Sequence, residues 1–403
     1  MATEQGIRLS FSRRNALKNI VRLIPAVMII AATLNALSCG SSGLLSPASN
    51  SGSPTATPTT GTGTLAFVTN YNDGKVSSFT RNTTTGALKH TGQVTAGKKS
   101  GPRGVVASPG GSFLYVANIN DDNIYEYSID QTNGTLKPLS PASVSNHSGT
   151  KPDQLAINPD GTLLWVTGAA GTVTSYLVDA ATGQLTWNGS ISGFNTPFGI
   201  TLHPSLAVLY VSDTSTGLIW PMTYNTSTGA LTKNFPAVHS SDLNANTPAA
   251  IAIDGGGDSL FIADQALGEV SSFSIDFTGA LTAIAVFTNS NTGDVPVGVG
   301  IGVNTGVEYL FTANQGGGSV SSFIASGTSL VVPPTVAAPY NGPTGLVVDP
   351  QNVFVYTADK FDGTVSQSTI NGSCGFQICV GPTVPTESPA NSSSGPFGIT
   401  LAQ

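Results

Sequence analysis

The chain has 403 residues, of which 9% are charged, 47 are glycine and 25 are proline. This composition is too apolar for a disordered chain and too rich in turn-forming residues for a helical protein, so it favours many short strands joined by tight turns. The formal net charge is −7, and it falls to −11 without residues 1–39, which hold five basic residues and one acidic residue. Phosphate backbones repel such an acidic surface, which excludes nucleic acid as a partner.

A positively charged segment opens the chain and precedes an apolar one. Arg13 and Arg14 lie ahead of the apolar stretch from Leu23 to Leu37, an order typical of a secretory signal peptide. The apolar stretch is short and contains Pro25, so it is unsuited to a permanent membrane span. The arginine pair resembles the twin-arginine export signal, and residues 1–39 are predicted to be an export signal.

The end of this signal carries a cysteine in a lipobox-like context. Residues 36–40, Ala-Leu-Ser-Cys-Gly, resemble a bacterial lipobox, which predicts Cys39 to be the lipidated first residue of the mature chain. The alternative is a signal peptide cut nearby, with Cys39 incidental. Residues 40–63 have the Ser, Gly, Thr, Pro and Ala composition of a disordered tether. We expect an exported periplasmic or cell-surface lipoprotein that contacts the membrane only through this N-terminal anchor.

Residues 64–403 are predicted to be one domain built from a repeated unit. Each unit opens with a proline and an apolar strand, turns, and continues into a second apolar strand, as in residues 102–118, PRGVVASPGGSFLYVAN. Such self-similarity at a fixed period is typical of repeat folds. The opening prolines follow one another at intervals of 45 to 53 residues and are Pro102, Pro152, Pro197, Pro248, Pro296, Pro343 and Pro396.

Two further strands complete each unit. The third strand alternates between apolar and polar residues, as in Val270-Ser271-Ser272-Phe273, which is the period-two pattern of a β-strand. A turn with a glycine follows, here Gly279, and a fourth strand begins at the next leucine, here Leu281. Four antiparallel strands in a repeat of about 50 residues describe one blade of a β-propeller.

The two ends of the domain predict how the ring closes. Residues 64–70 read as a second strand without a first, and residues 396–401 read as a first strand without a second. Together they form one blade. With six complete units, this gives an all-β, seven-bladed propeller of four-stranded antiparallel blades, closed by the C-terminal strand. Pro221 falls within a third strand, where it cannot donate a ladder hydrogen bond, so a bulge is expected there.

The units resemble the YVTN-type repeats of lactonase-like propellers, because Phe67–Asn70 and Leu114–Asn118 match the second-strand motif. The resemblance covers residues 64–403 and implies a seven-bladed propeller, with hydrolysis of sugar lactones as an activity found in the family. Members with that activity carry Gly-Pro-Arg-His ahead of a first strand and Asn-Glu after a second strand. Here Arg103 matches the arginine, but Gly104 replaces the histidine and no second strand ends in Asn-Glu. The general base is therefore missing from the place where the family would put it.

The strand order places two sets of residues around the channel mouth, on one face of the ring. The first set follows the opening prolines and comprises Arg103, Asp153, Phe198, Ala249, Val297, Thr344 and Phe397. The second set ends or follows the second strands. Two alternatives are that the Asn and Asp side chains cap their own turns and that Arg103 pairs with Asp153 across neighbouring blades. From both sets we predict a ligand-binding site formed by Arg103, Asn118, Asp121, Asp153, Asp213, Asp264 and Asp359.

The histidines and cysteines predict no metal and no other cofactor. Cys374 and Cys379 are predicted to form a disulfide, which is favoured outside the cytoplasm, and a metal site is the alternative. The histidines lie on different blades without metal-ligand spacing and are His90, His147, His203 and His239.

Three functions stay open at this point. The export signal, the tether and the missing catalytic residues favour a monomeric binding module at the cell envelope, whose channel-mouth face takes an unknown small molecule or an envelope protein. The first alternative is a hydrolase of lactones, in which Arg103 stabilises a developing oxyanion. The second alternative is a structural protein of a surface layer, which YVTN-type repeats also suggest.

Overall fold

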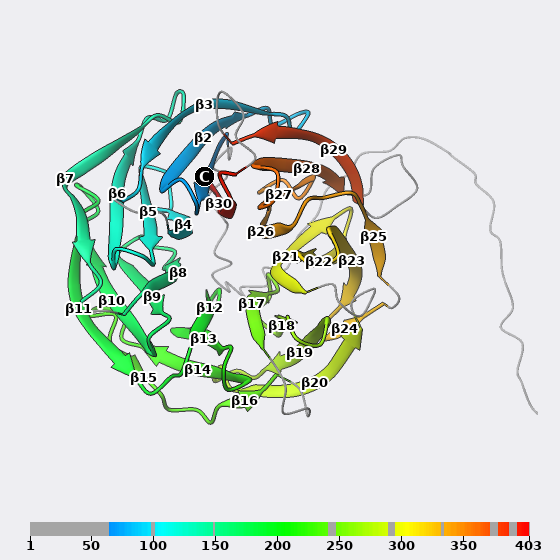
Figure 1. The fold of residues 1–403 in the computed structure, drawn as a ribbon. Coiled ribbons are helices and arrows are strands. Elements are labelled where there is room, and N and C mark those ends of the chain that lie inside the picture. The colour runs from blue at the N-terminus through cyan, green and yellow to red at the C-terminus, as the bar shows by residue number, and fades with distance from the viewer. Residues whose placement is uncertain are drawn as a thin grey trace, which may run out of the picture. The chain divides into compact units, whose positions relative to one another are not determined.

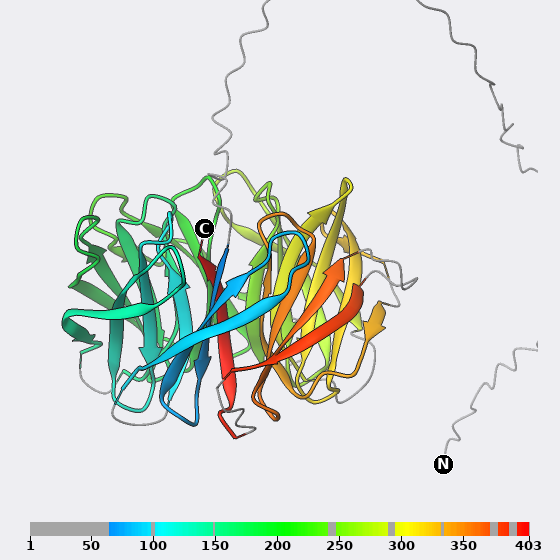
Figure 2. The same cartoon turned by 90° about the horizontal axis from the view of Figure 1, so that it is seen from above.

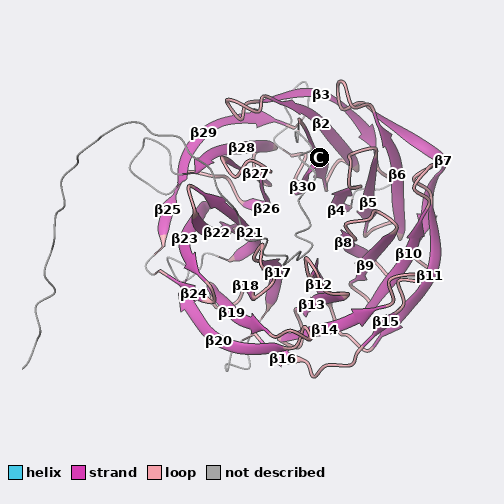
Figure 3. Ribbon diagram, turned by 180° about the vertical axis from the view of Figure 1, so that it is seen from behind, coloured by secondary structure: helices cyan, strands magenta, loops and turns pink. Residues whose placement is uncertain are grey.

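The computed structural model describes residues 64–97, 101–147, 150–240, 247–288, 295–331, 334–370, 378–386 and 393–402. They form seven antiparallel sheets, arranged as the blades of a ring (Figure 1), so the predicted seven-bladed propeller is confirmed. All regular elements of this part of the chain are strands (Figure 3), and no helix in it is long and apolar enough to cross a membrane. The predicted export signal, the lipidation site Cys39 and the tether lie outside the described residues.

Six blades take their strands in sequence order from the channel to the rim, and the seventh combines β30 with β1, β2 and β3. The innermost strands are β4 (Pro102–Ala107), β8 (Pro152–Ile157), β12 (Pro197–Leu202), β17 (Pro248–Ile253), β21 (Pro296–Asn304), β26 (Pro343–Val348) and β30 (Pro396–Ala402). The second strands are β1 (Leu65–Asn70), β5 (Phe113–Asn118), β9 (Leu163–Gly168), β13 (Val208–Asp213), β18 (Ser259–Asp264), β22 (Val307–Asn314) and β27 (Phe354–Asp359).

The third and fourth strands lie further from the channel. The third strands are β2 (Lys75–Arg81), β6 (Asn123–Ile129), β10 (Thr172–Val178), β14 (Leu218–Tyr224), β19 (Glu269–Ile275), β23 (Ser319–Ser326) and β28 (Thr364–Ile370). The outer strands are β3 (Leu88–Thr95), β7 (Leu136–Ser145), β11 (Leu185–Ser192), β15 (Leu231–Thr232) with β16 (Val238–His239), β20 (Leu281–Thr288), β24 (Ser329–Leu330) with β25 (Thr335–Ala337), and β29 (Ile378–Pro385).

The hydrophobic core is divided among the interfaces between blades. Seven clusters of buried apolar residues each join two neighbouring blades, as Phe67 of β1 does with Leu114 and Val116 of β5. The second strands are packed between two neighbours, so every residue of β1, β9 and β13 is buried. This two-sided burial explains why these strands read as continuous apolar runs.

The first and last described strands close the ring. β30 pairs antiparallel with β1, with Ala66 opposite Leu401 and Val68 opposite Ile399. In Figure 2 the red β30 runs alongside the blue β1. The predicted composite blade is therefore confirmed, and it joins the two ends of the propeller through a full set of strand pairings.

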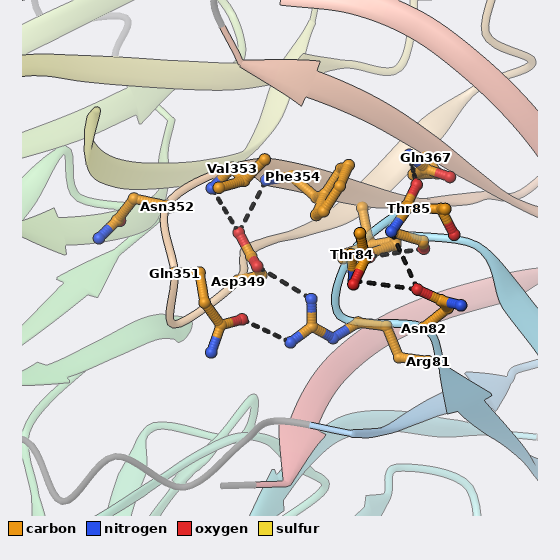
Figure 4. A network of polar contacts seen from close by, with 12 residues as sticks. Arg81, Asn82, Thr84, Thr85, Asp349, Gln351, Asn352, Val353, Phe354 and Gln367 are labelled. Carbon is orange, nitrogen blue, oxygen red and sulfur yellow. Dashed lines mark hydrogen bonds and ion pairs between the residues drawn. The ribbon is translucent and has the colours of Figure 1, made fainter. Parts of the chain in front are cut away.

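A buried ion pair reinforces the seam between the composite blade and its neighbour (Figure 4). Arg81, the last residue of β2, donates from Nη1 to Oδ2 of Asp349 at 2.9 Å and from Nη2 to Oε1 of Gln351 at 2.7 Å. Both charged side chains are fully buried. Asp349 also accepts hydrogen bonds from the backbone N–H groups of Val353 and Phe354, so its charge is well compensated.

The aromatic residue of the second-strand motif links neighbouring blades. The hydroxyl of Tyr115 donates to the carbonyl oxygen of Gly183 at 2.8 Å, in the turn between the third and fourth strands of the next blade. Such a bond satisfies a polar group that the motif would otherwise bury alone. An equivalent hydrogen bond, from a tyrosine hydroxyl or the tryptophan indole N–H to the carbonyl oxygen of the turn glycine, occurs at three further interfaces. The pairs are Trp165–Gly229, Tyr210–Gly279 and Tyr356–Gly86.

Pro221 does not cause the predicted bulge. β13 and β14 pair in continuous register, with Tyr210 opposite Pro221. The outer strand is divided instead, because β15 and β16 pair with β14 on either side of Pro221. The outer ladder is also irregular or divided at the middle of the third strand in the other blades, none of which has a proline there. Pro221 therefore occupies a position where no regular outer ladder needs its missing N–H.

Candidate ligand-binding site

The innermost strands surround a cavity of about 940 Å³ near the face where these strands begin. This volume lies within the range of small-molecule sites. Ala249, one of the predicted mouth residues, is fully buried and does not line the cavity. The other predicted mouth residues do line it and are Arg103, Asp153, Phe198, Val297, Thr344 and Phe397.

A ring of aliphatic side chains forms the deeper wall of the cavity. Each innermost strand contributes the third residue after its opening proline. A strand rises about 3.3 Å per residue, so these side chains start about 7 Å further along the strand than those directly after the prolines. They were not predicted, although an aliphatic residue recurs at this position in every unit. This aliphatic belt consists of Val105, Leu155, Ile200, Ile251, Val299, Leu346 and Ile399.

Arg103 on β4 contacts charged and aromatic groups at the mouth. Its Nη1 donates to Oδ2 of Asp153 at 2.5 Å, so the two side chains pair across neighbouring blades. The guanidinium carbon lies 4.9 Å from the ring centre of Phe397 and 5.5 Å from that of Tyr71, within cation–π range. The side chain of Arg103 is 27% exposed, and the hydrogen bond from Nη1 to Asp153 is the only one that its guanidinium makes among the described residues. Arg103 therefore keeps guanidinium N–H groups for a ligand.

Lys360 brings a second cation to the same mouth. It directly follows β27, lines the cavity and is half-buried. Burial lowers the pKa of Lys360, and the positive charge of Arg103 lowers it further. In the part of the chain that the structure describes, no carboxylate lies within ion-pair distance of the Lys360 ammonium. Among the described lining residues, two cations thus face a single carboxylate, and the mouth is positive in an acidic protein.

Asp153 on β8 is that single carboxylate. Its side chain is 2% exposed. Oδ1 accepts a hydrogen bond from Nε2 of Gln154 at 3.0 Å, while Oδ2 accepts the one from Arg103. Burial raises the pKa of Asp153 above its usual value, although the guanidinium of Arg103 acts in the opposite direction. These contacts fix the orientation of Arg103, and a raised pKa is also a property that a general base needs.

The other predicted ligand residues do not line the cavity. Asn118, Asp213, Asp264 and Asp359 are buried, and the side chains of the first three bind the segment that leads into the first strand of their blade, 17 to 22 residues upstream. The Asp213 carboxylate, for example, accepts the backbone N–H of Thr196 at 2.9 Å. Asp121 lies on the loop after β5. The side chains of the other four residues form hydrogen bonds in the pairs Asn118–Ala96, Asp121–Tyr125, Asp264–Thr247 and Asp359–Ser366.

The described residues include no group of three or more His, Cys, Asp or Glu side chains placed to hold a metal ion. His203 has a structural contact, because its Nε2 lies 2.9 Å from the carbonyl oxygen of Gly257. Cys379 on β29 is disulfide-bonded. Cys374 lies outside the described residues, so the pairing of these two cysteines stays a prediction.

Comparison with known proteins agrees with the fold. Residues 61–198 match the family described as "Lactonase, 7-bladed beta-propeller". No curated protein matches the chain. The described residues thus form a seven-bladed β-propeller, of which residues 61–198 are similar to the lactonase family.

Three solved structures share this architecture. A Bacteroides fragilis protein, provisionally named a 6-phosphogluconolactonase, has a TM-score of 0.71 at 16% identity, covering 84% of this chain and 98% of its own. A Lactobacillus plantarum protein has a TM-score of 0.68 at 16% identity, and the match covers 84% of this chain and 99% of that protein. The periplasmic gluconolactonase PpgL of Pseudomonas aeruginosa has a TM-score of 0.66 at 15% identity, and the match covers 84% of this chain and 99% of PpgL. At such identities the likeness shows the fold and leaves the activity to the site.

Proposed function

We propose that this protein binds a small molecule through a carboxylate or lactone carbonyl group at the mouth of the central cavity. The observation that carries the proposal is the pair of cations, Arg103 and Lys360, on a cavity wall with one carboxylate. Asp153 is already engaged by Nη1 of Arg103, so the Lys360 ammonium and the remaining exposed part of the Arg103 guanidinium are the donors left for an anionic or carbonyl oxygen.

The test is a binding titration with gluconate, which carries the carboxylate, and with glucose, which does not. Lys360→Met removes one cation without leaving a described carboxylate unpaired, so it should weaken gluconate binding about tenfold, which is the worth of one charge-assisted hydrogen bond. Lys151→Met is the matched control, because Lys151 is exposed and does not line the cavity. Equal gluconate affinities in the two variants would contradict the proposal.

A lactone hydrolase is the second candidate. It is supported by the paired Arg103 and Asp153 and by the gluconolactonase name of a structural neighbour. In this version Asp153 accepts a proton from the water that attacks the carbonyl carbon, and Arg103 with Lys360 stabilises the oxyanion that forms on the carbonyl oxygen. The oxyanion then collapses, the ring C–O bond breaks, and Asp153 returns the proton to the leaving alkoxide. Proton release from glucono-1,5-lactone, measured with the wild type and Asp153→Asn, tests it. Turnover that Asp153→Asn reduces by 10²-fold or more would favour the hydrolase.

We further propose that the domain acts outside the cytoplasm, held to a membrane by a lipid on Cys39. This part is supported by the sequence of residues 1–63 alone. It accords with the unphosphorylated ligands chosen for the titrations, because phosphorylated sugars are cytoplasmic.

A further inference from the structure

Two layers of different chemistry make up the cavity wall. Arg103, Asp153 and Lys360 occupy the mouth, together with neutral polar side chains such as Gln265 and Gln315. Below them lies the aliphatic belt, to which all seven blades contribute. Six of the seven belt side chains are partly exposed, and the seventh, Val299, is buried. The belt therefore presents apolar surface to whatever enters the cavity.

This layering is unfavourable for a fully hydroxylated ligand. A sugar acid carries a hydroxyl group on almost every carbon, and each hydroxyl that leaves water needs a hydrogen-bond partner. The belt side chains have none, so at this depth a hydroxyl group has only the backbone groups at the unpaired edges of the innermost strands. An aliphatic chain, by contrast, gains free energy from every methylene group that it buries against such a surface.

We infer that the natural ligand is an amphipath, with a carboxylate or lactone head at Arg103 and Lys360 and an aliphatic body on the belt. This inference rests on the proposed function for the position of the head and adds the chemical class of the body. The separation of about 7 Å along the strands between mouth and belt corresponds to a chain of several methylene groups. The volume of about 940 Å³ is ample for a chain of eight to ten carbons at roughly 30 Å³ per heavy atom.

The experiment is a calorimetric titration of the exported domain with straight-chain carboxylates from butanoate to decanoate, below their micelle concentrations. Gluconate is the hydroxylated comparison. Aliphatic γ-lactones of the same carbon numbers form a second arm, which distinguishes a carbonyl head from an anionic one. Affinity should rise about fourfold per methylene group, or about 0.8 kcal/mol, until the belt is covered. Gluconate should bind no more tightly than butanoate.

Different substitutions test the recognition of the ligand's head and the recognition of its aliphatic body. Val105→Thr adds a hydroxyl to the belt with little change of volume, so it should reduce the gain from butanoate to octanoate by a larger factor than it changes butanoate affinity. Val303→Thr is the matched control, since Val303 is 47% exposed and does not line the cavity. Lys360→Met should weaken all the carboxylates by the same factor.

Each outcome is decisive. Tighter binding of gluconate than of octanoate, or affinity independent of chain length, overturns the amphipath and leaves the proposed function standing. The same holds if Val105→Thr changes the chain-length dependence no more than Val303→Thr does. Binding of neither the carboxylates nor the lactones nor gluconate overturns both proposals together.

Discussion

Glu126 should make the stability of the propeller depend on pH near neutrality. It is the fourth residue of β6 and is 1% exposed. Burial raises its pKa from 4.5 to about 7, against a smaller opposing effect from the backbone N–H of Leu185 in the next blade. Its Oε2 has no hydrogen-bond partner among the described residues. The folded state thus holds a proton that the unfolded chain releases at a lower pH.

The sign and size of the effect follow from linkage. Because the folded pKa lies above the unfolded one, the stability contributed by protonated Glu126 is complete below pH 4.5 and is lost as the pH rises through 7. A difference of about 2.5 pKa units at 1.36 kcal/mol each amounts to about 3 kcal/mol. Glu126→Gln removes the ionisation, so it should raise the free energy of unfolding by up to about 3 kcal/mol at pH 8 and leave it nearly unchanged at pH 4.5.

The fold already accepts glutamine at this position. Gln367, the fourth residue of β28, donates from Nε2 to the carbonyl oxygen of Thr85 in the next blade at 3.1 Å. The assay is denaturant unfolding of wild type and Glu126→Gln between pH 4.5 and pH 8, with Asp160→Asn as an exposed control of equal charge change. A stability difference between wild type and Glu126→Gln that does not grow with pH would refute the reasoning.

Three further predictions concern the closure of the ring and the export of the protein. Deleting residues 396–403 removes β30, so it should lower the free energy of unfolding by roughly 5 kcal/mol or more, and an unchanged denaturant midpoint would contradict the closure. Arg81→Met leaves the buried Asp349 without its cation and should cost about 3–5 kcal/mol by the same assay; a loss below 1 kcal/mol would show that the pair is dispensable. Cys39→Ala should abolish acylation while export continues, and wild-type protein without an acyl group by mass spectrometry would rule out the lipid anchor.

The fold was predictable because its signals repeat. Each unit carries the same order of opening proline, apolar strands and turn glycine, so an ambiguous copy is interpreted from its neighbours. The partial units at the two ends predicted the composite blade without any structural information. Pro221 shows the limit of this reasoning: the outer ladder is irregular at this point of the third strand even in blades without proline, and the sequence does not reveal that irregularity.

The site was only partly predictable. Arg103 and Asp153 were found because they follow opening prolines, a position that the strand order places at the channel. The same order placed Asp213 and Asp264 near the mouth, but whether a side chain turns into the channel or onto the segment that leads into its blade depends on local hydrogen bonds. Lys360 was not among the predicted ligand residues, because it follows a second strand and not an opening proline. The pairing of Arg81 with Asp349, separated by 268 residues, has no local sequence signal at all.

The most direct test of the account is a crystal structure of residues 64–403 with octanoate bound. The account predicts the carboxylate within hydrogen-bond distance of the Arg103 guanidinium and Lys360 Nζ, and the carbon chain in contact with Ile251 and Leu346 of the aliphatic belt. A carboxylate bound away from both cations would contradict the proposed function. A carboxylate in place with its chain directed out to solvent would contradict the amphipathic ligand.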